Sequence, residues 1–149
     1  MLEPGDSAPD FTLETTEGTF ALSDVEGAAV IFFFPKAGSR VCTKEACGFR
    51  DELDELKGYD ARVLGISSND GLERLREFAR EHDLDYPLAS DVDGKVAERY
   101  GLGGLLGLGH RMKRATYVVD DGVVVEAIKG LLSSDKHVEG SLEAVEDLG

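Results

Sequence analysis

The sequence has only two cysteines, Cys42 and Cys47, in 149 residues. It has no long hydrophobic run either. The longest, Ala28 to Phe34, falls far short of the roughly 20 apolar residues that a membrane-spanning helix needs. The first ten residues, MLEPGDSAPD, contain neither the basic nor the apolar region of a signal peptide. These absences predict a cytoplasmic protein, in which two cysteines favour a redox or metal-binding role over a permanent disulfide.

Basic residues are also scarce. The chain has 16 lysines and arginines against 30 acidic residues, which gives a net charge of −14. Because such a charge repels phosphate groups, nucleic acids and anionic membrane surfaces are not expected as partners. An acidic, lysine-poor surface is typical of proteins from a salt-rich cytoplasm, since salt screens the self-repulsion. In that case the unfolding temperature should rise from low to molar salt, and an unchanged value would contradict a halophilic origin.

The apolar residues that are present recur with the periods of strands and helices. Ala28 to Phe34 is uniformly apolar, as expected of a strand that is buried on both faces, and Arg62 to Ser67 is similar. Hairpins are expected around Glu17-Gly18 and Asp121-Gly122. Helices are expected over about Val41 to Lys57 and over Gly94 to Tyr100. Two more are expected to begin at a capping box formed by Asp70 and Glu73 and at a possible N-cap, Ser134. This order predicts a single α/β domain over residues 1–149, a thioredoxin-like three-layer sandwich with a mixed central sheet and an N-terminal hairpin.

The two cysteines lie five positions apart in the expected helix. At 100° per residue, Cys42 shares the apolar stripe with Ala46 and Phe49, whereas Cys47 lies about 140° away. Their Cα atoms are roughly 8.6 Å apart in an intact helix, but a disulfide needs about 4.4–6.8 Å. A permanent disulfide is therefore not expected, and a disulfide that forms after local unfolding of the helix end remains possible.

The surroundings of Cys42 favour a reactive thiol. Free N–H groups at a helix N-terminus stabilise thiolate over thiol. The window from Pro35 to Arg50 has a net charge of +3 within this acidic chain, and Ser39 lies about one helical turn from the Cys42 sulfur. The alternative is that these charges are ordinary solvated residues at a helix start.

A metal site is the weaker alternative. A closed zinc site needs four ligands, commonly in two closely spaced pairs. The chain offers one cysteine pair, and its histidines, His82, His110 and His137, are scattered singly. We expect His82 to pack at a helix end and no metal to be bound.

The segment PKAGSRVCTKEAC, residues 35–47, resembles the signature Pro-x-x-x-Thr/Ser-x-x-Cys of peroxiredoxins. Its continuation Cys-Thr-x-x-x-Cys is typical of the bacterioferritin-comigratory-protein or PrxQ branch. The segments PGDSAPDFTL, FRDELDEL, VLGIS and KRATYVVDDG resemble family segments in the same order, so the resemblance covers nearly the whole chain.

This resemblance implies a thioredoxin fold and the reduction of hydrogen peroxide and alkyl hydroperoxides. By position, Cys42 matches the peroxidatic cysteine and Cys47 the resolving cysteine. Pro35 and Ser39 match the proline and hydroxyl residue of the motif, and Arg114 matches the distal arginine. The implied reductant is thioredoxin or a similar dithiol protein. A monomer is expected, and no metal, haem or flavin cofactor is required.

Two features depart from the family pattern. Ser39 stands where threonine is commoner, so the hydroxyl lacks the methyl group that restricts its rotamer. The segment GLGGLLGLGHRMKR, residues 101–114, is rich in glycine and predicts a mobile loop that borders the site.

Two other functions fit the residues less well. A thioredoxin-type disulfide reductase would have two residues between its cysteines rather than four. A redox sensor, in which oxidation of Cys42 unfolds the helix start, remains an alternative.

Overall fold

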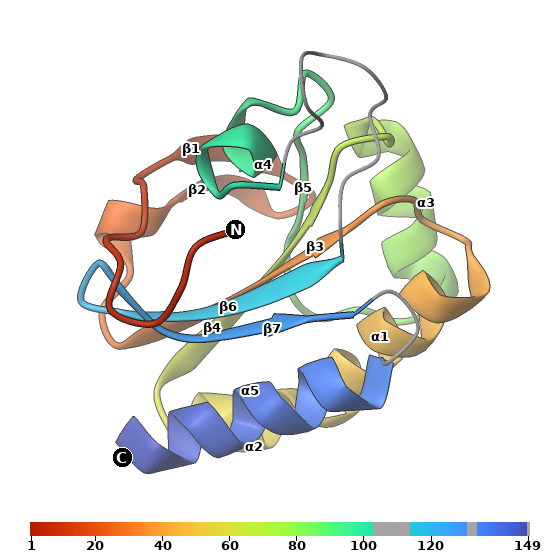
Figure 1. The fold of residues 1–149 in the computed structure, drawn as a ribbon. Helices are drawn as coiled ribbons and strands as arrows, with labels where there is room; N and C mark the ends of the chain where they lie inside the picture. Colours follow the sequence, from red (N-terminus) through yellow and green to blue (C-terminus); the bar gives the residue numbers. More distant parts are fainter. Residues whose placement is uncertain (103–113, 131–133, 149) are drawn as a thin grey trace.

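The computed structural model describes residues 1–102, 114–130 and 134–148. Within them, seven strands form one sheet in the order β2-β1-β5-β4-β3-β6-β7 (Figure 1). The strands are β1 (Thr12–Thr15), β2 (Gly18–Ala21), β3 (Ala28–Phe34), β4 (Ala61–Ser67), β5 (Leu88–Ser90), β6 (Ala115–Asp120) and β7 (Val123–Lys129). β3 pairs in parallel with β4 and antiparallel with β6, so the sheet is mixed as expected.

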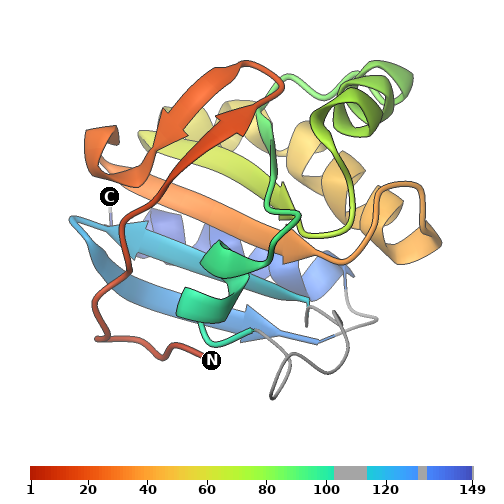
Figure 2. The same ribbon diagram turned by 90° about the horizontal axis from the view of Figure 1, so that it is seen from above.

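The helices cover both faces of this sheet. They are α1 (Arg40–Asp51), α2 (Leu53–Gly58), α3 (Leu72–Glu81), α4 (Lys95–Arg99) and α5 (Ser134–Leu148), with a short 3₁₀ helix at Leu22–Asp24. The side chains of α1, α2, α3 and α5 join one buried cluster, and those of α4 and the N-terminal segment join the other. Figure 2 shows α4 on the opposite face of the sheet from α5, with the N-terminal hairpin at one edge of the sheet. The three-layer thioredoxin-like architecture is therefore confirmed.

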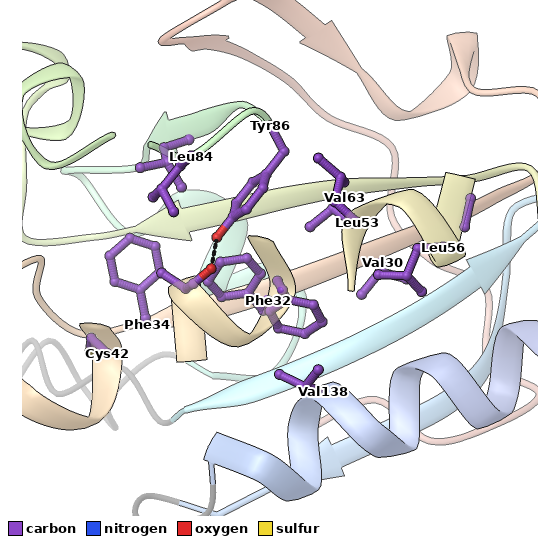
Figure 3. Close-up of a cluster of buried hydrophobic side chains, with 14 of the residues drawn as sticks. Val30, Phe32, Phe34, Cys42, Leu53, Leu56, Val63, Leu84, Tyr86 and Val138 are labelled. Atoms are coloured by element: carbon purple, nitrogen blue, oxygen red, sulfur yellow. Dashed lines mark hydrogen bonds between the residues drawn. The ribbon is translucent and has the colours of Figure 1, made fainter. Parts of the chain in front are cut away.

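β3 is an interior strand of the sheet, between β4 and β6. Alternate side chains, from Val30 to Phe34, face the helices α1, α2 and α5, while Ile31 and Phe33 face the N-terminal segment and α4. All seven residues of β3 are buried. The ring of Phe32 stacks on Phe49 of α1 with centroids 4.6 Å apart. Figure 3 shows this cluster, with Cys42 at its edge beyond Phe34.

The turn after β3 fixes where α1 begins. Gly38 has a φ of 91°, a left-handed conformation that favours glycine. A Cβ atom there would also lie 2.8 Å from the guanidinium of Arg74. Ser39 then caps α1, because its Oγ accepts a hydrogen bond from the Cys42 backbone N–H. The start of α1 therefore lies at the carboxyl end of β3.

One sequence-based expectation needs correction, and one strand was missed. The single helix expected from Val41 to Lys57 is divided at Glu52, whose φ and ψ of −99° and 6° leave the helical region. Its N–H is bonded to the carbonyls of Gly48 and Arg50, which tightens the turn between α1 and α2. Strand β5 was not expected, because three residues between turns carry no periodic signal. No helix in these described ranges is long and apolar enough to cross a bilayer.

Candidate active site

Cys42 lies in the first turn of α1 and is only 1% exposed. Its backbone N–H donates to Ser39 Oγ at 3.3 Å. Cys47 lies on the same helix and is half-buried, and both thiols are free. Cys42 thus lies on the buried face of α1 with Ala46 and Phe49, as the helical period predicted.

Arg114 meets Cys42 although 72 positions separate them. Because β6 runs antiparallel to β3 and Ala115 pairs with Phe33, the residue before β6 lies beside the end of β3. Arg114 is 3% exposed, and its Nη2 donates to Cys42 Sγ at 2.8 Å. Its Nη1 donates to Glu45 Oε1 at 2.8 Å. One guanidinium therefore bridges the cysteine sulfur and a buried carboxyl group.

Glu45 is 0% exposed and points into the protein from α1. Burial raises the pKa of its carboxyl group from 4.5 to about 7, although Arg114 lowers it by charge and hydrogen bonding. Its second oxygen, Oε2, has no hydrogen-bond partner among the described residues and lies 3.6 Å from His137 Nδ1. The structure therefore places a titratable group with a free acceptor next to Arg114.

His137, from α5, completes this buried group. Its Nε2 is 3.0 Å from the Gly130 carbonyl oxygen, and its Nδ1 is 2.7 Å from Thr116 Oγ1. Burial lowers the pKa of the imidazole, which favours the neutral ring. Sequence reasoning treated His137 only as a possible metal ligand and Glu45 only as one charge. The signal that was missed is the position of Glu45: this charged residue lies three residues after Cys42 on the apolar stripe of the helix, where it is expected to be buried.

A second pair of residues holds the segment between β3 and α1. Asp70 Oδ2 accepts hydrogen bonds from the Ala37 backbone N–H and from Ser67 Oγ, each at 2.7 Å. Asn69 Nδ2 donates to the Pro35 carbonyl oxygen. The expected capping box at Asp70 is therefore wrong: Gly71 is the N-cap of α3 and provides no side-chain bond. Instead of capping α3, the Asp70 carboxylate accepts a hydrogen bond from the buried backbone N–H of Ala37.

The remaining expected site residues are less closely joined to Cys42. Pro35 is half-buried directly after β3. Apart from Gly101, Leu102 and Arg114, the glycine-rich segment lies outside the described residues. His82 packs at the end of α3, with its ring 5.0 Å from that of Phe78, as expected. No group of three or more histidine, cysteine or acidic residues among those described is arranged to hold a metal ion.

Comparison with known proteins agrees with this fold and arrangement. The AhpC/TSA family matches residues 4–128, and the chain belongs to this family. Its relatives are peroxiredoxins of the Bcp/PrxQ group, which are thiol-dependent peroxidases. Peroxiredoxin Bcp of Escherichia coli is 37% identical over 143 residues, which cover 91% of each chain.

Solved structures extend the comparison. Peroxidoxin BcpB of Mycobacterium tuberculosis superposes with a TM-score of 0.92 at 37% identity, over 100% of this chain and 99% of that one. The bacterioferritin comigratory protein of Xanthomonas campestris, studied for alkyl peroxide reduction, superposes with a TM-score of 0.83 over 93% of this chain and 91% of that one. Because its identity is 24%, this second likeness shows the fold alone.

The Asp70 contacts generate a stability prediction. Asp70→Ala leaves the Ala37 N–H and the Ser67 hydroxyl without their acceptor, and should lower the free energy of unfolding by about 2 kcal/mol. Hydrogen exchange at the Ala37 amide should accelerate in parallel. Asp70→Asn keeps an oxygen at this place and is the matched control. If urea unfolding gave the same stability for both variants, the two hydrogen bonds would not hold this segment.

The buried Glu45 generates a pH prediction. The folded protein keeps a proton on Glu45 that the unfolded chain releases above about pH 4.5, so ionisation favours unfolding between pH 4.5 and 7. Glu45→Gln cannot ionise. Its stability relative to the unsubstituted protein should therefore increase across this interval, by on the order of 3 kcal/mol, and stay constant above it.

Urea unfolding of both proteins at several pH values measures this difference. Glu146→Gln, an exposed substitution in α5, is the control and should show no such trend. A constant difference between Glu45→Gln and the unsubstituted protein from pH 4.5 to 8 would show that the pKa of Glu45 is ordinary.

Proposed function

We propose that this chain reduces hydrogen peroxide and alkyl hydroperoxides at Cys42, forms an internal disulfide with Cys47, and is recycled by thioredoxin or a similar dithiol protein. The observation that carries the proposal is the 2.8 Å contact between Arg114 Nη2 and Cys42 Sγ in a buried site at a helix start. Membership of the AhpC/TSA family and the Bcp relatives support the peroxidase chemistry. The proposal includes a monomer that works in the cytoplasm.

The first step needs a thiolate at Cys42. The guanidinium of Arg114 and the N-terminal end of α1 both favour negative charge on the sulfur. The thiolate attacks the terminal oxygen of the hydroperoxide and the O–O bond breaks. The sulfur becomes a sulfenic acid, and the leaving oxygen takes a proton and departs as water or an alcohol.

Groups around Cys42 stabilise the charge that moves along the O–O bond. Ser39 Oγ accepts from the Cys42 N–H, so the hydroxyl proton is left to donate to a peroxide oxygen. Arg114 carries a full positive charge that stabilises the leaving oxygen. Pro35 limits the access of water to the sulfur.

The second step requires α1 to unwind at its start. In an intact helix the two Cα atoms lie about 8.6 Å apart, too far for a disulfide. Oxidation removes the negative charge from sulfur and so weakens its contact with Arg114, which favours unwinding of the first turn. Cys47 then attacks the sulfenic sulfur, the S–O bond breaks, and water leaves. An external dithiol opens the resulting disulfide by exchange.

Cysteine variants test this cycle. Cys42→Ser should abolish peroxide consumption, because the nucleophile is lost. Cys47→Ser should consume one equivalent of peroxide and then stall with thioredoxin as reductant, since the internal disulfide cannot form. Turnover is followed with thioredoxin and its reductase, and the sulfenic acid is trapped with dimedone. Full thioredoxin-linked turnover by Cys47→Ser would exclude the internal disulfide.

A further inference from the structure

Glu45 and His137 form a buried titratable pair that the steps above do not use. Both side chains are 0% exposed, and they come from different helices, α1 and α5. Within the part of the chain that the structure describes, Glu45 Oε2 has no hydrogen bond, and it lies 3.6 Å from His137 Nδ1. A buried acceptor without a donor is rare in native proteins and calls for an explanation.

The contacts of His137 fix which ring nitrogen carries its proton. The Gly130 carbonyl can only accept, so His137 Nε2 is the nitrogen that donates to it. In the neutral ring, Nδ1 then has a lone pair, to which the Thr116 hydroxyl donates. The Nδ1 lone pair also lies nearest to Glu45 Oε2. Because the Thr116 hydroxyl occupies this lone pair, His137 offers Glu45 Oε2 no N–H donor. An ionised carboxylate oxygen there would lack a compensating hydrogen bond, whereas a protonated carboxyl group carries no charge that needs one.

The charges around Arg114 also favour a protonated Glu45. Its guanidinium bonds both Cys42 Sγ and Glu45 Oε1. With Cys42 as thiolate and Glu45 ionised, two negative charges would share one buried cation, and burial penalises the uncompensated one. With Glu45 protonated, one negative charge faces one positive charge. When the sulfur is oxidised its charge disappears, and Arg114 then favours the ionised carboxyl group.

We propose that the Glu45–His137 pair is a proton store that balances the charge of Cys42: Glu45 is neutral while Cys42 is a thiolate and ionises when the sulfur is oxidised. This inference rests on the proposed function. The step is balanced, because thiolate, hydroperoxide and protonated Glu45 give sulfenic acid, alcohol or water, and ionised Glu45. One negative charge stays beside Arg114 throughout, and no proton is taken from solvent. His137 is a positioning residue, since it acts through Glu45.

Among the described residues, Tyr86, Lys136 and Arg114 also act on the pair. From the segment before β5, Tyr86 faces Glu45, and burial raises the pKa of its phenol well above 10, so it stays neutral. Burial lowers the pKa of His137, and Arg114, directly before β6, and Lys136 of α5 lower it further. His137 is therefore neutral near pH 7. The pKa of about 7 for Glu45 lets its carboxyl group hold a proton just below neutrality.

Proton counting tests the proposal. Cys47→Ser and the double variant Cys47→Ser/Glu45→Gln are each mixed with one equivalent of hydrogen peroxide at about pH 6 in weak buffer with an indicator dye. The glutamine still accepts from Arg114 but holds no titratable proton. The parent variant should take up about one proton fewer per oxidised Cys42 than the double variant. Equal uptake would overturn the proposal.

Alkylation separates this inference from the peroxidase function. Iodoacetamide removes the thiolate charge of Cys42 without any peroxide chemistry. The Cys47→Ser protein should then release about one proton more than the double variant, even if peroxide proves not to be the substrate. Cys47→Ser/Glu146→Gln, with the exposed Glu146 of α5 substituted, is the matched control and should behave like the parent.

An infrared difference spectrum makes the proposal testable without a glutamate variant. The Cys47→Ser protein should lose the C=O stretch of a protonated carboxyl group when Cys42 is alkylated, and gain the carboxylate bands. A spectrum in which no protonated carboxyl group is lost would contradict the proposal.

Discussion

The guanidinium of Arg114 is the contact on which the rest of the site depends. It is buried and donates to two acids, Cys42 Sγ and Glu45 Oε1, each at 2.8 Å. Arginine suits this place because its planar fork presents several N–H donors in fixed directions and stays charged. A buried cation of this kind is stable only if its partners carry compensating charge. In the proposed mechanism, the protonation of Glu45 and the charge of Cys42 are linked through this one residue.

The topology of the sheet explains why this contact can exist in so small a chain. The end of β3 and the start of β6 are neighbours in an antiparallel pair, so Arg114 and the turn toward α1 meet at one edge. The segment between β3 and α1 is held from the other side by Asn69 and Asp70, which follow β4. Three segments far apart in sequence thus converge on the first turn of α1. That turn is also the part that the proposed disulfide requires to unwind.

The sequence predicts local features of this protein well and its long-range contacts poorly. The uniformly apolar run Ala28–Phe34 predicts β3 with its observed limits, and the helical period places Cys42 on the buried face of α1. Arg114 was identified through the family resemblance, because no local pattern marks it. Glu45 and His137 were missed as a pair, since their contact depends on how α5 packs against α1. Asp70 was misread as a helix cap because its real partner, the Ala37 N–H, lies 33 positions away.

The rate of peroxide attack in an Arg114→Lys variant tests the central claim most directly. Lysine keeps the positive charge but has a single ammonium group, which lacks the planar fork that holds the sulfur and the carboxyl group together. The second-order rate constant for hydrogen peroxide is measured by stopped flow in the Cys47→Ser background, with Arg99→Lys as a matched control outside the site. The rate should fall by about a hundredfold, comparable to the loss of one preorganised donor in an active site. A rate equal to that of the parent would contradict the account.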